Sequence, residues 1–251
     1  MGATSGFAAR SVQIAFVAIV IGVWWGVTKT HAVMPLFLPP VGLVARTIDQ
    51  LFSTGEAWAA VRLTLLTIVE AYALAVVAGL LAGYFVTRSR FLTEVFEPLI
   101  ANLFTIPIIL FFPLFVLFFG IGPGSKIAYG ALYGFFPVAL NTIAGFSRVE
   151  RRFLWAARSM GASPFGLFRH VLVPSALPVI VTGLRISFLI CLASVLGGEE
   201  LSAAAGIGKN IELAAELMDP ARMYSWIVFV VLTTTVLNLV LSQIEGRVRE
   251  R

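Results

Sequence analysis

Six long apolar runs, nearly free of charged residues, constrain the fold of this chain more than any other feature. A helix needs about 20 apolar residues to cross the hydrocarbon core of a bilayer, which is about 30 Å thick. Charged residues make up 12% of the 251 residues, whereas a soluble domain carries about 25%. The sequence therefore predicts an all-α membrane protein with six transmembrane helices, forming a single domain over residues 1–251. The six runs cover residues 11–28, 61–86, 99–120, 127–145, 175–196 and 223–243.

The first run lies so close to the N-terminus that it could be taken for the apolar core of a signal peptide. Against this, it contains Trp24 and Trp25 and continues into Lys29 without a small-residue cleavage site. We therefore expect a retained membrane span.

The distribution of Lys and Arg predicts the orientation of the spans. Cytoplasmic segments near span ends carry the excess of positive charge. With the N-terminus inside, 11 of the 18 Lys and Arg residues fall in inner segments and five in outer ones. We therefore expect a multi-pass membrane protein with both termini cytoplasmic. Anionic lipid headgroups then account for the net charge of +5, and no nucleic acid partner is expected.

The connecting segments and the prolines carry further local signals. From Val41 to Phe52, apolar residues recur at helical spacing, which predicts an amphipathic helix at the membrane interface. The outer segment 197–222 is expected to hold a short helix. Pro107 and Pro113 in the third run, and Pro137 in the fourth, are expected to kink their helices.

Small residues spaced four apart occur in three of the apolar runs. Such pairs let the backbones of neighbouring membrane helices approach closely. The pairs are Gly22/Gly26, Gly79/Gly83 and Gly130/Gly134.

Residues for catalysis or metal binding are scarce. His31 and His170 fall on opposite sides of the membrane and Cys191 lies inside a span, so no His/Cys metal site and no intrachain disulfide is expected. The segment 206–210, Gly-Ile-Gly-Lys-Asn, departs from the phosphate-binding Walker pattern at two positions. The sequence predicts a protein that is not an enzyme and holds no cofactor of its own, so any energy source lies in other subunits.

The inner loop of residues 146–174 is too long for a simple turn. Its residues from Glu150 to Met160 favour a short helix, which Gly161 can end because glycine tolerates the left-handed backbone. Ser163, followed by proline, has the pattern of an N-cap for a second short helix, expected to end at Pro174. Two such helices at right angles form a rigid knob for a partner protein; the alternative is a solvated basic connector. The residues expected at the contact are Leu154, Trp155, Ala156, Ala157, Arg158, Gly161, Ala162 and Pro174.

The 146–174 loop resembles the EAA loop of the membrane permease subunits of ATP-binding cassette (ABC) importers. That loop reads Glu-Ala-Ala, three residues, Gly, nine residues, Ile, one residue, Leu-Pro. Trp155 occupies the acidic position, so the resemblance implies no salt bridge from this residue to the ATPase. The resemblance covers about residues 60–245, and the flanking segments are similar to the nitrate, sulfonate and taurine branch. The residues that carry it are Ala156-Ala157, Gly161, Val171 and Val173-Pro174 in the loop, and Ile106-Pro107, Phe136-Pro137, Asn141-Thr142, Thr182-Gly-Leu-Arg185 and Gly206-Ile-Gly208 outside it.

The resemblance implies an importer with several subunits in a bacterial inner (plasma) membrane. It would contain two permease subunits, expected to be a homodimer, two cytoplasmic ABC ATPases that bind ATP and Mg, and an external substrate-binding protein. Transport would follow alternating access, with the knobs transmitting closure of the ATPase pair to the permease.

Charged residues in or beside the spans are candidates for function, because an ionisable side chain at mid-bilayer costs at least about 2.5–3.5 kcal/mol. Arg185 could attract an anionic substrate along the pathway; alternatively, it forms a structural pair with Glu70 or with backbone carbonyls. Glu199 and Glu200, at the outer end of the fifth run, could serve an outer gate or contact the binding protein. The alternative for these two is a solvated loop edge.

Two classes of function remain open at this point. The first is an importer permease for a small anion such as a sulfonate or nitrate, or for a vitamin precursor or aromatic acid. The second is a stand-alone channel or secondary transporter, which should show paired intramembrane carboxylates or inverted repeats. Neither is found in the sequence, and a co-isolated ATPase would discriminate between the classes.

Overall fold

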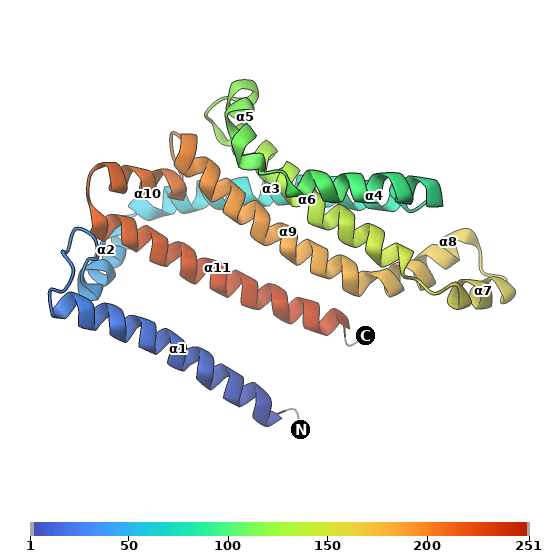
Figure 1. Ribbon diagram of the computed structural model, residues 1–251, viewed down its shortest axis with the longest axis horizontal. Helices are drawn as coiled ribbons and strands as arrows, with labels where there is room; N and C mark the ends of the chain where they lie inside the picture. The colour runs from blue at the N-terminus through green and yellow to red at the C-terminus, as the bar shows by residue number, and fades with distance from the viewer. Residues whose placement is uncertain (1–2, 250–251) are drawn as a thin grey trace. The chain divides into compact units, whose positions relative to one another are not determined.

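The computed structural model describes the backbone of residues 3–249, with all side chains except those of residues 3–10, 14, 56, 244 and 247–249. Every regular element in this range is a helix, which confirms the all-α fold class. A 3-10 helix (Ile108–Phe111) precedes α5, and a π-helix (Phe168–Leu172) joins α8 to α9. The α-helices are α1 (Ala3–Lys29), α2 (Val41–Ser53), α3 (Glu56–Val86), α4 (Arg90–Thr105), α5 (Phe112–Phe119), α6 (Pro123–Ser147), α7 (Arg151–Ser159), α8 (Pro164–Leu167), α9 (Val173–Ser202), α10 (Ile207–Glu216) and α11 (Pro220–Arg249) (Figure 1).

Five helical segments in the described part of the chain are long and apolar enough to cross a membrane. They match five of the six predicted runs, with ends that differ by several residues. The segments are Ser11–Lys29, Ala57–Val86, Pro123–Ser147, Pro164–Ser202 and Pro220–Gln243.

The third predicted span, 99–120, is not a single helix. It divides into α4 and the Ile108–Phe119 segment, which are bent by 76° relative to each other. Ile106 adopts an extended backbone (ψ 130°), as expected for a residue that precedes proline, because the ring of Pro107 disfavours the helical conformation there. The expected kink at Pro113 is wrong, because Pro113 lies in the first turn of α5. A backbone N–H at that position would have no hydrogen-bond partner within the helix, so proline is tolerated there.

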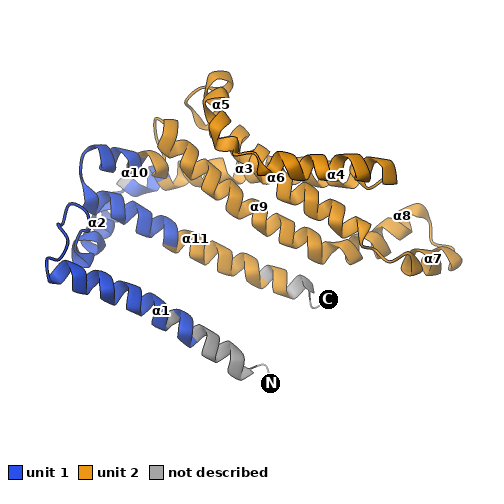
Figure 2. Cartoon of the chain, in the orientation of Figure 1, with its two compact units in different colours: residues 1–60, 210–231 blue, residues 61–209, 232–251 orange. Residues whose placement is uncertain are grey.

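The chain divides into two compact units, coloured separately in Figure 2. Unit 1 contains residues 1–60 and 210–231, and unit 2 contains residues 61–209 and 232–251. The 146–174 loop and the four charged residues singled out above all belong to unit 2.

Unit 1 is held together partly by side chains that bond to backbone carbonyls. The indole nitrogen of Trp24 in α1 donates to the carbonyl of Pro39 at 2.9 Å. The buried hydroxyl of Ser225 in α11 donates to the carbonyl of Val44 in α2 at 3.2 Å. Helix α2 buries Val44 and Leu51 on one face, which confirms the predicted amphipathic helix.

Unit 2 depends on close packing of α6 against α3 and α9. A Cβ atom on Gly134 in α6 would overlap Cys191 Sγ and lie 2.9 Å from Ser187 Oγ, both in α9. A Cβ atom on Gly79 in α3 would lie 2.6 Å from Val138 Cβ in α6. Glycine is therefore required at both helix crossings, as the small-residue pairs predict. The pair in α1 differs, because both of its glycines face open space in the described structure.

Candidate functional site

The 146–174 loop connects α6 to α9 and contains α7 (Figure 1). Helix α7 ends in a Schellman motif, in which Gly161 adopts a left-handed backbone with φ +80°. Its N–H donates to the carbonyl of Arg158 at 2.9 Å, and the N–H of Ala162 donates to that of Ala157 at 3.0 Å. The predicted helix stop at Gly161 is confirmed, and it fixes the direction in which the chain leaves α7.

The second half of the loop begins as predicted but continues further. Ser163 caps α8, since its hydroxyl accepts a hydrogen bond from the N–H of Gly166 at 3.1 Å. The expected end at Pro174 is wrong, because the helical path from Pro164 runs without interruption to Ser202. The π-helix immediately before Pro174 widens the turn, which makes room for a ring that would otherwise clash with the carbonyl four residues back.

The loop presents large apolar side chains and arginines to its surroundings. Trp155 is 62% exposed, and Phe153 and Phe165 are also exposed. Ala157 is buried, so Ala156 is the alanine that the loop presents. Of the remaining predicted contact residues, Arg158, Gly161 and Pro174 are exposed, and Leu154 and Ala162 are half-buried.

The charge of the loop is strongly positive. Five arginines and one glutamate lie between residues 146 and 174. The glutamate, Glu150, already forms an ion pair with Arg152, with Arg152 Nε 2.5 Å from Glu150 Oε2. An acidic partner surface would therefore complement the exposed guanidinium groups of Arg151 and Arg158.

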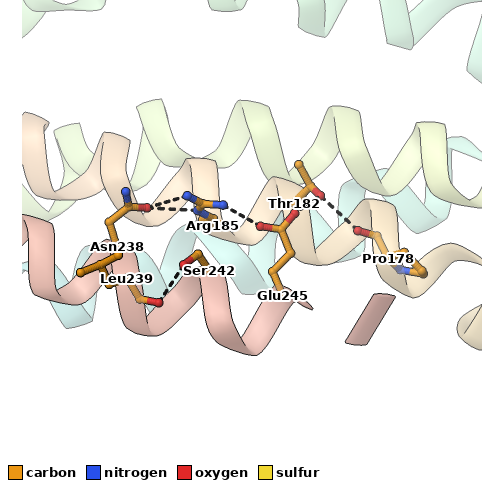
Figure 3. A network of polar contacts seen from close by, with 7 residues as sticks. All are labelled: Pro178, Thr182, Arg185, Asn238, Leu239, Ser242 and Glu245. Atoms are coloured by element: carbon orange, nitrogen blue, oxygen red, sulfur yellow. Dashed lines mark hydrogen bonds and ion pairs between the residues drawn. The ribbon is translucent and has the colours of Figure 1, made fainter. Parts of the chain in front are cut away.

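Arg185 in α9 is bound by two side chains of α11 (Figure 3). Its Nη1 donates to Glu245 Oε2 at 2.8 Å, and its Nε and Nη2 donate to Asn238 Oδ1 at 3.1 and 2.9 Å. The other carboxylate oxygen of Glu245 accepts from the hydroxyl of Thr182 at 2.8 Å. Glu70 is exposed on α3, and the expected pair between Arg185 and Glu70 is replaced by the pair with Glu245.

Glu199 and Glu200 occupy opposite environments although they are adjacent. Glu200 is exposed, whereas Glu199 is only 2% exposed and accepts hydrogen bonds from Thr64 Oγ1 and from the N–H of Gly208. A solvated loop edge is therefore wrong for Glu199. The reason is that α9 continues to Ser202, beyond the predicted span end at residue 196, and the N–H of Gly208 at the start of α10 bonds to the Glu199 carboxylate.

Sequence reasoning missed the side-chain partners of Arg185 and Glu199. Glu245 lies beyond the predicted end of the sixth run, and its pairing with Arg185 needs two helices to be adjacent. Lys126, one of the five Lys and Arg residues that the predicted topology places in outer segments, is 1% exposed and donates to backbone carbonyls. The sequence signal that could have identified Lys126 as a buried charge is its position directly before the fourth apolar run, 127–145. In the described part of the chain, no cluster of His, Cys, Asp and Glu has the makeup of a metal site.

Comparison with known proteins gives a consistent result. Residues 75–251 match the family model described as "Binding-protein-dependent transport system inner membrane component". The taurine transport system permease protein TauC of Escherichia coli is 30% identical over 242 residues, which is 94% of this chain and 88% of the relative. The formylaminopyrimidine transport permease protein ThiX of Halalkalibacterium halodurans is 34% identical over 76% of each chain. The riboflavin transport system permease protein RibX of Chloroflexus aurantiacus is 30% identical over 89% of this chain and 84% of the relative.

A solved structure shares the fold. An inward-facing form of the MetNI methionine ABC transporter superposes with a TM-score of 0.66 at 21% identity. The match covers 76% of this chain and 95% of the solved one.

Proposed function

The chain belongs to the family of binding-protein-dependent transport system inner membrane components, and on that premise we propose that it is the permease subunit of an ATP-driven ABC importer. As a transport component it is not an enzyme. The observation that carries the proposal is the family match over residues 75–251, which includes α6, the 146–174 loop and α9. The ATP and Mg belong to separate ATPase subunits.

The 146–174 loop is the element that couples this subunit to its ATPase. Trp155 fills an apolar pocket on the ATPase, in place of an acidic residue, and the exposed Arg158 faces acidic side chains there. The exposure of both side chains supports this role, as do the local ion pair of Glu150 and the fixed geometry around Gly161. Leu154, Ala156, Ala157, Ala162 and Pro174 complete the contact or hold its shape.

Transport proceeds by alternating access in an assembly of two copies of this chain, two ATPases and an external binding protein. ATP binding closes the ATPase pair, the two loops move with it, and the permease opens outward to accept substrate from the binding protein. Hydrolysis then returns the permease to the inward-open state. The assembly lies in a bacterial inner membrane with both termini of the chain cytoplasmic, which the excess of Lys and Arg in the inner segments supports.

The cargo is a small organic nutrient or anion. Relatives named for taurine and aliphatic sulfonates support an anion, whereas relatives named for formylaminopyrimidine and riboflavin support a vitamin or its precursor. Arg185 adds nothing to the case for an anion, because its guanidinium already binds Glu245 and Asn238. Its proposed role is to join α9 to α11, while Glu70 and Glu200 remain candidates for the substrate pathway because both are exposed.

Isolation of the tagged chain from native membranes tests the assembly. An importer permease carries about one ATPase subunit per copy through purification, whereas a stand-alone channel or secondary transporter carries none. Trp155→Ala should reduce the retained ATPase at least tenfold. Phe165→Ala is the matched control, because Phe165 is an equally exposed aromatic residue of the same loop outside the proposed contact. Equal retention by both variants would contradict the role of Trp155.

A thermal-shift screen of the partner binding protein tests the cargo. A true ligand raises the melting temperature by mass action. The screen should include sulfonates, nitrate, aromatic acids and pyrimidine vitamin precursors. A response only to sulfonates or nitrate would establish an anion importer, and a response only to uncharged heterocycles would exclude one.

A further inference from the structure

Two oppositely charged residues are buried together at one end of unit 2. Glu199 in α9 is 2% exposed and Lys126 in α6 is 1% exposed. Burying a charge is costly unless hydrogen bonds satisfy it, so the partners of both side chains indicate what the pair stabilises.

The Glu199 carboxylate holds the start of α10 against α3. Both of its oxygens accept from the Thr64 hydroxyl, at 2.8 and 2.9 Å, and one also accepts from the N–H of Gly208 at 3.0 Å. The same Thr64 oxygen accepts from the N–H of Ile207 at 3.0 Å. The first N–H groups of a helix have no partner within the helix. At the α10 N-terminus two of them are satisfied, the N–H of Gly208 by the Glu199 carboxylate and the N–H of Ile207 by the Thr64 hydroxyl bound to that carboxylate.

Lys126 holds the other end of the same connection. Its ammonium donates to the carbonyl of Ser202, the last residue of α9, and to the carbonyl of Ile121 at 2.7 Å. A cation at a helix C-terminus is favourable because the last carbonyls there carry partial negative charge. The turn of residues 203–206, between α9 and α10, is thus held by Lys126 at its start and by Glu199 at its end.

The turn borders a partly open pocket rather than a packed core. The pocket has a volume of about 210 Å³ and is lined by Leu63 and Thr67 of α3, by residues 121–123, by Lys126 and Glu199, and by the small side chains of residues 203–205. Ala204 and Ala205 are exposed. Three alanines beside a pocket contribute little apolar packing, so a few polar contacts hold the turn in place.

We propose that Thr64, Lys126 and Glu199 form a latch that keeps the 203–206 turn closed, and that the outer gate of the permease opens by breaking the Thr64–Glu199 contact. The assignment to the outer side rests on the proposed function and orientation. Glu199 is a positioning residue here, since it acts by holding α10 and touches no substrate. When the turn lifts, water replaces the lost partners of both charges, so the open state avoids an unpaired buried charge.

Cysteine accessibility measures the latch directly. Leu63→Cys places a thiol in the pocket wall, where the native side chain is half-buried. The rate at which a membrane-impermeant maleimide labels this thiol, compared between variants in vesicles that contain the complete assembly, reports changes in how often the turn opens. Thr64→Val removes the hydroxyl from the latch, while Thr64→Ser keeps it. A hydrogen bond to a charged group corresponds to a shift of about 10- to 100-fold in an equilibrium. In the Leu63→Cys background, we expect Thr64→Val to increase the labelling rate of the introduced thiol at least tenfold and Thr64→Ser to restore the parent rate.

Three controls separate a latch from a general loss of structure. Thr67→Val removes a buried hydroxyl that bonds to the carbonyl of Leu63 in its own helix, so it should leave the rate unchanged. The native Cys191 is fully buried between α6 and α9, so it should stay unlabelled while the latch opens and become labelled only if the helices separate. Glu199→Gln and Glu200→Gln form a second pair, of which only the first should increase labelling.

Three results would each overturn a different part of the account. Equal rates for Thr64→Val and its parent, or labelling of Cys191 together with the introduced thiol, would overturn the latch. Labelling from the cytoplasmic side alone, in inverted vesicles, would overturn its assignment to the outer gate. Absence of a co-purified ATPase would instead overturn the proposed importer function and leave the measured latch behaviour in place.

Discussion

The pair formed by Arg185 and Glu245 should stabilise the packing of α9 against α11 by an amount that a double-mutant cycle can measure. The cycle consists of Arg185→Gln, Glu245→Gln and the double variant. Each single variant leaves one charge without its partner, and Glu245→Gln also weakens the acceptor for Thr182. The double variant removes both charges together, so its loss of stability should be smaller than the sum of the two single losses.

The structure sets the size of this effect. Hydrogen bonds to charged groups contribute about 1.5–3 kcal/mol each. The Arg185 side chain is 32% exposed and that of Glu245 10% exposed, which places the pair between a surface and a buried ion pair. We therefore expect each single variant to lose about 2 kcal/mol and the coupling energy to be about 1–2 kcal/mol.

Equilibrium unfolding in mixed detergent micelles provides the assay. The pair of Arg90 and Glu94 is the matched control, because its nitrogen–oxygen distance is 2.7 Å but its side chains are 88% and 61% exposed. For that i,i+4 pair the coupling should be only about 0.3–0.5 kcal/mol. Equal coupling energies for the two pairs would refute the reasoning from burial. Loss of substrate uptake by a stable Arg185→Gln/Glu245→Gln variant would restore Arg185 as a substrate-binding residue.

Three further substitutions test the packing of the helices and the shape of the 146–174 loop. Gly134→Ala should lower the free energy of unfolding by about 1–3 kcal/mol through overpacking. Gly22→Ala meets open space inside a helix and favours the helical backbone, so it should not lower the melting temperature. Gly161→Ala should lower the free energy of unfolding by about 1–2 kcal/mol because the φ of Gly161 is +80°, and Gly161→Asn should lower it by less. Equal melting temperatures for these two variants would contradict this. Ser163→Ala removes the hydroxyl that accepts a hydrogen bond from the N–H of Gly166, and it should lower the free energy of unfolding by about 1 kcal/mol. The measurement is hydrogen exchange, which should become faster only in α8.

Sequence patterns were sufficient for the features that depend on neighbouring residues. Long apolar runs predicted five membrane-crossing helices, and Gly161 and Ser163 predicted the turn within the 146–174 loop. In each case the signal and the structure lie within a few residues of each other. Hydrophobicity, backbone freedom at glycine and capping by serine act locally, so they can be inferred without knowledge of the tertiary fold.

The features that the sequence missed depend on which helices become neighbours. The partner of Arg185 is 60 residues away, and the hydroxyl that binds Glu199 is 135 residues away. No periodicity or motif connects residues at such separations. The break at Pro107 has a similar origin: proline predicts an interruption, but a 76° bend also requires the two halves to pack separately.

Transport in proteoliposomes tests the identification as an ATP-driven importer most directly. The purified assembly is reconstituted with ATP on the side of the ATPase subunits and with the loaded binding protein, carrying the ligand found by thermal shift, on the opposite side. With ATP, an importer should raise the concentration of labelled ligand on the ATPase side above its concentration on the opposite side. A non-hydrolysable ATP analogue should abolish this accumulation. Movement that stops at equal concentrations and does not depend on ATP would contradict the importer and identify a passive channel.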